Sequence, residues 1–128
     1  MGTIQQSYDP TADVTLFDVQ GFLTANELIA AFTAQMSERP TNDIIWYFHD
    51  ADLSGFVTAD MRRMIECARS FEKVRPDPRT VLVARGRIEA ILFKLYSEIA
   101  KDARLRTSFH ITDTRDKALA WLRSSTTG

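Results

Sequence analysis

The sequence has few of the residues that would assign it to a class at once. Its 128 residues include one cysteine, Cys67, and two histidines, His49 and His110. A single cysteine cannot form a disulfide within the chain and does not make a zinc site by itself. We therefore expect neither a disulfide-stapled domain nor a cysteine-rich metal domain, and we expect a reducing compartment such as the cytoplasm.

Long apolar runs and a strong net charge are also missing. No apolar segment approaches the roughly 20 residues of a membrane-spanning helix, and residues 1–10 lack the basic and apolar parts of a secretion signal. We therefore expect no membrane span. The net charge of −1 argues against nucleic-acid binding, which depends on many contacts from lysine and arginine to phosphates.

The charges that are present are unevenly distributed. Residues 1–61 hold nine acidic residues and one basic residue, whereas residues 62–106 hold twelve basic and six acidic residues. Solvated positions on helices and turns explain such a distribution. The two unlike halves also suit the association of one copy of the chain with another.

Strand-like and helix-like segments alternate along the chain. The expected strands are residues 3–8, 14–20, 43–48, 80–84 and 109–111, and a helix follows each strand from the second onward. Parallel strands joined by helices form right-handed crossovers. The sequence predicts one α/β domain over 1–123, with a mixed, mainly parallel sheet of about five strands and four helices in the order β-β-α-β-α-β-α-β-α. Residues 124–128 are expected to form a flexible tail.

Two local signals support these boundaries. Thr24 and Glu27 stand three residues apart in a capping box, which marks the start of a helix, and Pro40 ends that helix. The apolar run Ile44–Phe48 is typical of a strand that is covered on both faces. It should lie in the middle of the sheet.

Three segments resemble the STAS superfamily, above all its SpoIIAA-like branch, also called STAS/SEC14-like. They are the strand 44–48 that leads to a helix starting at Thr58, the strand 80–84 that leads to another helix, and the ending 109–122, where a strand and an acidic turn precede Ala-Leu-Ala-Trp-Leu. The resemblance covers nearly the whole chain. It implies a non-enzymatic regulatory module. Partner-switching members are anti-sigma-factor antagonists, and a partner kinase phosphorylates a serine at the start of a helix.

At that helix start the sequence departs from the family. Residues 57–60 are Val-Thr-Ala-Asp, where the family has Asp-Ser-Ser-Gly. The candidate phospho-acceptors are Thr58 and, upstream in the loop, Ser54. Capping of the first helical turn by Thr58 would account for that residue without any phosphorylation.

Residues 50–58 also fit the first nine positions of a calcium-binding EF-hand loop. The twelfth position, which needs a bidentate glutamate, is Met61, and the segment before the loop is strand-like. We therefore expect no metal site here, and no other pattern in the sequence calls for a cofactor.

A better candidate site is one edge of the sheet. Arg85, Gly86 and Arg87 follow one buried strand, while Asp50, Asp52 and Ser54 follow its neighbour. The carboxyl ends of parallel strands meet at one edge, where ligands tend to bind. This edge could hold an anion or a partner. The alternative is that Gly86 provides turn geometry and both arginines are solvated.

The third helix carries apolar residues on two sides. We expect Ile88, Ile91, Leu92, Leu95 and Ile99 to face the core. Phe93, Tyr96 and Ala100 would then form a flank that contacts a partner, a second copy or an apolar ligand, or that the terminal helix buries.

No order of residues typical of a catalytic triad is present, so the chain is not expected to be an enzyme. Our first hypothesis is a STAS-like module that binds a protein or a second copy of itself. The second is a domain that encloses a small apolar or lipid-like ligand between the sheet and the third helix, as the SEC14-like comparison implies.

Overall fold

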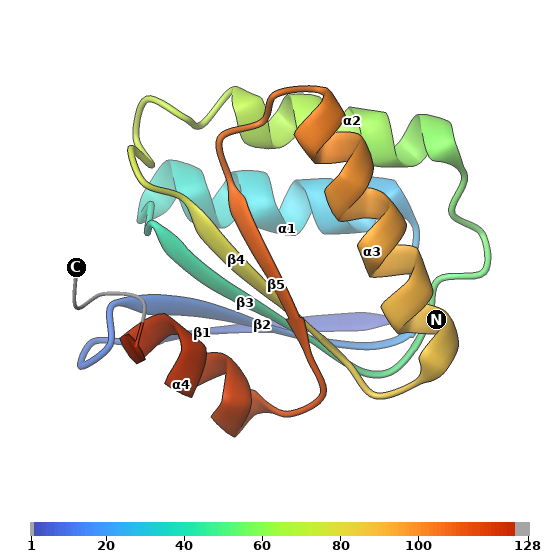
Figure 1. The fold of residues 1–128 in the computed structure, drawn as a ribbon, viewed down its shortest axis with the longest axis horizontal. Helices are drawn as coiled ribbons and strands as arrows, with labels where there is room; N and C mark the ends of the chain where they lie inside the picture. Colours follow the sequence, from blue (N-terminus) through green and yellow to red (C-terminus); the bar gives the residue numbers. More distant parts are fainter. Residues whose placement is uncertain (1, 125–128) are drawn as a thin grey trace.

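A computed structural model describes residues 2–124 and contains one sheet with helices on both faces (Figure 1). The strands lie side by side in chain order: β1 Thr3–Asp9, β2 Val14–Phe22, β3 Asp43–Asp52, β4 Arg79–Ala84 and β5 Ser108–Thr112. The helices are α1 Ala25–Glu38, α2 Thr58–Arg69, α3 Arg87–Asp102 and α4 Arg115–Ser124. The predicted order of elements is confirmed. Ser124 ends α4, and the rest of the predicted tail, 125–128, lies outside the described residues.

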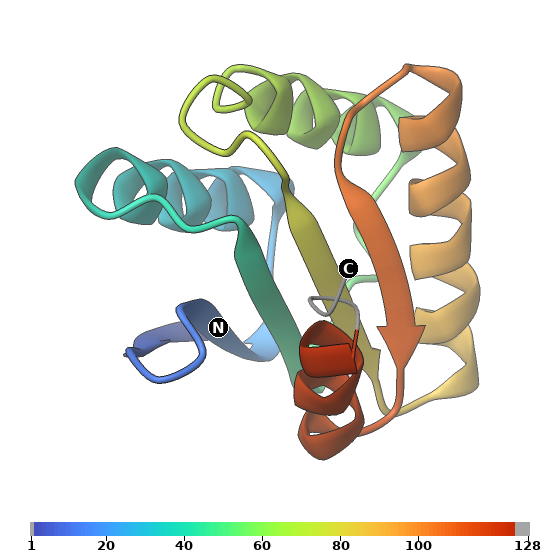
Figure 2. The ribbon, with the colours of Figure 1, turned by 60° about the vertical axis from the view of Figure 1, so that its left-hand side comes forward.

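The directions of the strands explain the layers. β1 is antiparallel to β2, and β2 to β5 are parallel to one another. Because the chain moves across the sheet in one direction and its crossovers have one hand, α1, α2 and α3 all cover the same face. Only α4 lies on the opposite face (Figure 1), and Figure 2 shows β5 at the sheet edge beside α3.

The start and end of α1 follow the sequence signals. Thr24 accepts a hydrogen bond from the Glu27 N–H through its side-chain oxygen, and Glu27 accepts one from the Thr24 N–H, so the predicted capping box is present. The helix ends at Glu38, two residues before Pro40. A proline disfavours helical geometry in the residue before it, and this accounts for the end of α1.

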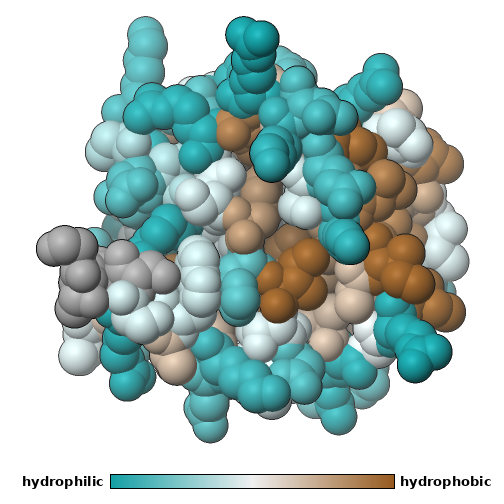
Figure 3. All heavy atoms as spheres, viewed as in Figure 1, coloured by the Kyte–Doolittle hydropathy of each residue, from teal (hydrophilic) through white to brown (hydrophobic). Residues whose placement is uncertain are grey.

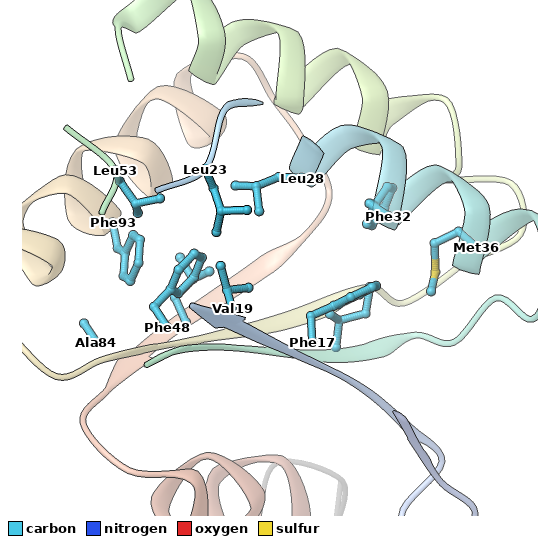
Figure 4. Packing of buried hydrophobic residues seen from close by; sticks show 12 residues of the cluster. Phe17, Val19, Leu23, Leu28, Phe32, Met36, Phe48, Leu53, Ala84 and Phe93 are labelled. Carbon is cyan, nitrogen blue, oxygen red and sulfur yellow. The ribbon is translucent and has the colours of Figure 1, made fainter. Parts of the chain in front are cut away.

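β3 lies in the middle of the sheet, as predicted, and its side chains pack on both faces. Ile44 and Phe48 are buried under α1, α2 and α3, while Ile45 is buried on the α4 face. Figure 4 shows part of the larger core, with side chains from the sheet meeting those of α1 and α3. The smaller core joins Val81 and Val83 to Ala118 and Leu122 of α4. Burial of this apolar surface is the main force that holds the layers together.

β3 extends four residues beyond the predicted strand. Its last residues pair with the end of β2, Ala51 with Gly21 and Asp52 with Phe22, after an irregularity between Val19 and Gly21. Gly21 has a φ of 80° and Asp50 a φ of 55°. Such left-handed residues are typical of bulges that allow a strand to continue past a break in its register. Asp50 and Asp52 therefore lie in a strand, where the sequence predicted a loop.

Candidate functional site

One hollow of the described structure lies between the sheet and α1, α2 and α3, which cover the same face of it. This cavity has a volume of about 80 Å³. Its floor is formed by Trp46 and Phe48 of β3, Leu82 of β4 and Phe109 of β5, and residues of α1, α2 and α3 form the rest of the wall. An apolar hollow with a few polar groups is the usual form of a small-molecule site.

Aromatic rings set the shape of this cavity. The ring centroids of Phe48 and Phe93 are 4.6 Å apart, and Figure 4 shows Phe93 facing Phe48 across the gap between α3 and the sheet. Further along α3, Tyr96 meets Phe109 edge to face at 5.4 Å. Contacts of this geometry between aromatic rings are favourable, so they hold the wall of the cavity in place.

One charged side chain lines the cavity. Arg75, between α2 and β4, is 2% exposed. Its Nε donates to the carbonyl oxygen of Thr41 at 2.7 Å, its Nη2 donates to that of Asn42 at 3.0 Å, and its guanidinium lies 5.5 Å from the centre of the Phe32 ring. Burial lowers the pKa of Arg75 to about 10, because the charged form loses its water.

Tyr96 lines the same cavity. Burial raises the pKa of Tyr96 above its usual range, the nearby Cys67 adds to this rise, and the positive charge of Arg75 opposes it. Tyr96 and Arg75 both line this cavity.

The prediction that Phe93, Tyr96 and Ala100 form an exposed flank of α3 is wrong. Phe93 and Ala100 are buried at 5% and 1% exposure and Tyr96 is half-buried, so these residues form the inner face of the helix. Their role as the wall of an apolar pocket, one of the alternatives, agrees with the cavity for Phe93 and Tyr96. The terminal helix does not bury them, because α4 packs on the other face of the sheet (Figure 1).

The outer face of α3 is instead formed by residues that the sequence placed in the core. Ile88, Ile91 and Leu95 are 81%, 66% and 44% exposed. We call these three residues the α3 stripe. Figure 3 shows apolar side chains gathered over α3 at the right of the molecule, among polar ones.

The two halves of the predicted edge site do follow neighbouring strands. Phe48 of β3 and Ala84 of β4 are the last residues that pair between these two strands. Asp50 and Arg85 lie just beyond them in the chain. From there the chains separate, because the end of β3 pairs with β2 while residues 85–87 enter α3. Among the described residues no ion pair joins the acidic half to the arginines. Asp50 instead lies 3.3 Å from His49, between Oδ2 and Nε2.

Local hydrogen bonds organise the acidic half of this edge. The carboxylate of Asp52 accepts the backbone N–H of Ser54 at 3.0 Å. Bonds from the hydroxyl and the backbone of Ser54 lower the pKa of Asp52, since they favour its charged form. Asp52 thus stabilises the turn into residues 54–57.

The start of α3 is not shaped as an open anion site. Gly86 is the N-cap residue with an extended φ of −119°, so the explanation by special turn geometry does not hold. A Cβ at this position would collide with the carboxylate of Glu89, which lies over the helix start. An acidic side chain there already interacts favourably with the helix dipole. Arg85 and Arg87 are exposed.

The two candidate phospho-acceptors are exposed near the start of α2. Val57 is the N-cap residue, and its N–H donates to the carboxylate of Asp60 at 3.1 Å. Thr58 is therefore the first helical residue and does not cap the helix, contrary to the expectation. Within residues 2–124 its hydroxyl makes no hydrogen bond, and Ser54 lies four residues upstream in the preceding turn.

The side chains with nucleophilic or acid-base chemistry are separated. Cys67 lines the cavity and lies 3.3 Å from the Thr33 hydroxyl, whereas His110 stacks on Trp121 on the α4 face, at 4.7 Å between ring centroids. In the part of the chain that the structure describes, no group of three His, Cys, Asp or Glu side chains could hold a metal ion. None of the helices within 2–124 is long and apolar enough to cross a membrane.

Nothing in the local sequence indicates that Arg75 belongs to a site. It precedes Pro76, in a turn where an arginine is normally solvated. The carbonyl groups that it binds lie more than 30 residues away in the chain, at Thr41 and Asn42. Only the tertiary structure brings them together.

No protein-family model matches the chain, and no curated protein matches it either. Its fold, in contrast, is similar to solved structures. An anti-sigma factor antagonist from Mycobacterium paratuberculosis superposes with a TM-score of 0.62 over 96% of this chain and 95% of that one, at 13% sequence identity. An uncharacterised protein from Shewanella loihica with a SpoIIAA-like fold gives a TM-score of 0.60 over 94% and 93%, at 14% identity. The chain therefore has a SpoIIAA-like fold, as the sequence resemblance implied.

Proposed function

We propose that this chain is a non-enzymatic regulatory module that binds a protein partner through the α3 stripe. The supporting observation is the exposure of Ile88, Ile91 and Leu95 on one helix. They are spaced by three and four residues, which places them on one side of the helix. Aliphatic side chains at this spacing are the anchors that a helix presents to an apolar groove.

The surroundings of the stripe resemble the rim of an interface. Exposed charged residues flank it, among them Arg87 and Lys94. Protein interfaces typically combine an apolar centre with a polar rim that remains in contact with water. We include Asp50, Asp52, Ser54, Arg85 and Gly86 of the predicted edge as the part of this rim nearest to the start of α3.

The partner that we favour is a signalling protein of the anti-sigma-factor kind. The neighbour from Mycobacterium paratuberculosis is an anti-sigma factor antagonist by name, and its fold matches nearly the whole of this chain. Fold similarity at this identity leaves the partner itself to experiment. A second copy of the chain is the other partner that the α3 stripe and the unlike charges of the two halves suit.

Thr58 is our candidate for a regulatory phosphorylation site, with Ser54 as the second candidate. Thr58 is exposed at the first position of α2, and its hydroxyl is not needed to cap the helix. A phosphate would benefit from the helix dipole but would be repelled by the nearby Asp60. Phosphorylation would therefore alter the charge of the surface close to Asp50, Asp52 and Ser54, which we include in the rim of the interface.

The binding proposal is tested with an Ile91→Glu variant. Wild-type and variant chains are titrated with the anti-sigma factors of the source organism, and light scattering over a range of concentrations reports self-association. We expect Ile91→Glu to weaken the observed association at least about tenfold, because a charge replaces a buried anchor. Val74→Glu, at an apolar position that is 51% exposed but lies outside the stripe, is the control. Equal binding by all three chains contradicts the proposal.

A second candidate function has its own observation. The cavity of about 80 Å³ is lined mainly by apolar and aromatic side chains, and such cavities take up small apolar molecules. We propose that it binds a small ligand, either beside or instead of the regulatory role. Native mass spectrometry of the freshly purified chain tests for a bound small molecule, which should disappear when a larger side chain, as in Ala68→Leu, fills the cavity.

A further inference from the structure

The inference concerns the chemistry of the molecule that the cavity accepts, and it rests on the ligand-binding proposal above. It begins with the donors of Arg75. Nε and Nη2 are used by the carbonyl groups of Thr41 and Asn42, whereas Nη1 donates to no group among the described residues. Arg75 is almost fully buried and lines the cavity. Asp18 Oδ1 is the only side-chain N or O atom of the described residues that is sealed from water without a partner. Nη1 of Arg75 is therefore not sealed off, and it can donate to an acceptor that enters the cavity.

The charge at this corner is not balanced by the protein. The acid that acts on Arg75 is Asp43, but both of its carboxylate oxygens are held by Arg79. The Arg79 Nη2 lies 2.6 Å from Oδ2 and its Nε lies 2.8 Å from Oδ1. Among the described residues no acid lies within ion-pair distance of Arg75 itself. Because an unpaired charge in the interior is costly, the guanidinium of Arg75 favours an anionic acceptor over a neutral one.

Other polar groups lie at the same end of the cavity. Thr80 stands near the start of β4, beside Ile44 and Phe109 in the sheet, and Tyr96 packs against Phe109. Both line the cavity, and neither side-chain hydroxyl makes a hydrogen bond within residues 2–124. The groups near the carboxyl ends of the strands are apolar, for example Leu53, Phe56 and Met61. The cavity is therefore polar at one end and apolar at the other.

We propose that the cavity binds a small monocarboxylic acid with a short apolar chain. Its carboxylate would accept hydrogen bonds from Arg75 Nη1 and from the hydroxyls of Thr80 and Tyr96, and its chain would lie against Leu82 and Phe93. A carboxylate provides about four acceptor positions, which suits several donors.

The volume limits the size of this acid. A buried cavity of about 150 Å³ accommodates benzene, and one water needs about 10–15 Å³. The 80 Å³ found here is about half of the benzene cavity, so it suits an acid smaller than benzene, with about three carbons, and not a phospholipid. A whole lipid molecule therefore does not fit this cavity. This limits the second hypothesis, a small apolar or lipid-like ligand, to its smaller form.

The test uses propanoate and its neutral counterpart propan-1-ol. Each is titrated into the wild-type chain, and NMR follows the methionine methyl groups. Met61 and Met64 line the cavity, whereas Met36 is buried in the same core and does not line it. We expect propanoate to shift the signals of Met61 and Met64 but not that of Met36. It should bind at least about tenfold more tightly than propan-1-ol, since a hydrogen bond to a charged group is involved.

Two variants locate the carboxylate. Arg75→Gln should weaken propanoate binding at least about tenfold and leave propan-1-ol binding unchanged. Arg106→Gln is the matched control, because Arg106 also donates to a carbonyl, that of Pro76 at 2.7 Å, but does not line the cavity. This control should bind propanoate like the wild type. If Arg75→Gln fails to fold, the comparison of propanoate with propan-1-ol on the wild type decides alone.

The outcomes separate the two proposals. If propan-1-ol and propanoate bind the wild type equally well at Met61 and Met64, the carboxylate inference is wrong and ligand binding itself stands. If neither compound shifts these methyl groups, both the inference and the ligand-binding function are wrong. Weaker propanoate binding in Arg106→Gln, equal to that in Arg75→Gln, would also overturn the inference.

Discussion

Arg79 and Asp43 form a two-point ion pair at the amino ends of β4 and β3, with Nη2 to Oδ2 at 2.6 Å and Nε to Oδ1 at 2.8 Å. The two residues also face each other in the register of the strands. Arg79 also donates a hydrogen bond to the carbonyl oxygen of Leu122 in α4 at 3.1 Å. One guanidinium therefore connects the sheet to α4.

The first prediction concerns this pair. Asp43→Asn leaves Arg79 largely buried beside a weaker, neutral acceptor, and we expect it to lower the free energy of unfolding by about 3 kcal/mol. Urea denaturation measures the change. Asp113→Asn is the control, because Asp113 pairs with Lys117 at 2.9 Å on the exposed surface, where ion pairs contribute little. Equal urea midpoints for the wild type and Asp43→Asn would show that the pair does not stabilise the fold.

The second prediction concerns the orientation of α3. Phe93→Ala removes a buried ring that contacts Phe48, and we expect a loss of about 3 kcal/mol in the free energy of unfolding. Ile91→Ala, two residues away on the exposed side, should change it by less than about 0.5 kcal/mol. Chemical denaturation of both variants tests which face of α3 is buried. A larger loss of stability for Ile91→Ala than for Phe93→Ala would show that the inner face of the helix is assigned wrongly.

The third prediction concerns the start of α2, where the N-cap residue Val57 has no side-chain oxygen to accept a hydrogen bond. Val57→Thr keeps the shape of the side chain and adds that acceptor. We expect thermal unfolding to show a gain of about 0.5 to 1 kcal/mol. Thr58→Val should leave stability unchanged, because Thr58 does not cap the helix. A loss of stability in Thr58→Val similar to that of a removed cap would restore its role as the capping residue.

Much of the architecture could be predicted from local sequence. The capping box at Thr24 and Glu27, and the apolar runs at 44–48 and 80–84, depend on neighbouring residues alone, and each appears in the structure. The order of strands and helices then determines a mainly parallel sheet, since crossovers have a fixed hand.

The face of α3 could not be predicted in the same way. The helix carries large apolar residues on both sides, so periodicity allows two inner faces. The choice is made by aromatic partners in the sheet, Phe48 for Phe93 and Phe109 for Tyr96. These lie at other places in the chain, and their positions follow only from the tertiary fold.

The burial of Arg75 in the cavity wall could not be predicted from the sequence either. A charged residue is normally exposed, and the burial of Arg75 depends on two carbonyl groups in the turn before β3. The carboxyl edge was predicted more successfully, because the ends of neighbouring parallel strands must lie at one edge. The extra pairing between β2 and β3 that moved Asp50 and Asp52 into a strand depends on a bulge, which the sequence did not indicate.

The last prediction concerns the stability of the fold in alkali and uses Tyr96. Burial raises the pKa of this hydroxyl above the ordinary value of 10.0. In the unfolded chain Tyr96 loses its proton near pH 10, whereas in the folded chain it keeps it. Its contribution to stability is therefore complete below pH 10 and is lost as the pH rises above that value. Arg75 acts in the opposite direction, because its folded-state pKa is lowered to about 10, but it is present in both proteins that are compared.

We therefore expect Tyr96→Phe to lose less stability than the wild type between a pH below 10 and a pH above it. Urea denaturation at the two pH values measures this difference. Tyr8→Phe serves as a comparison, since the pKa of Tyr8 is also raised, by its hydrogen bond to Asp13 at 2.8 Å, but at the exposed hairpin. Water screens that site, so the effect of Tyr8→Phe should be smaller. If the wild type and Tyr96→Phe lose the same stability, the hydroxyl of Tyr96 is not held in the apolar interior, and the polar end of the cavity lacks one of its donors.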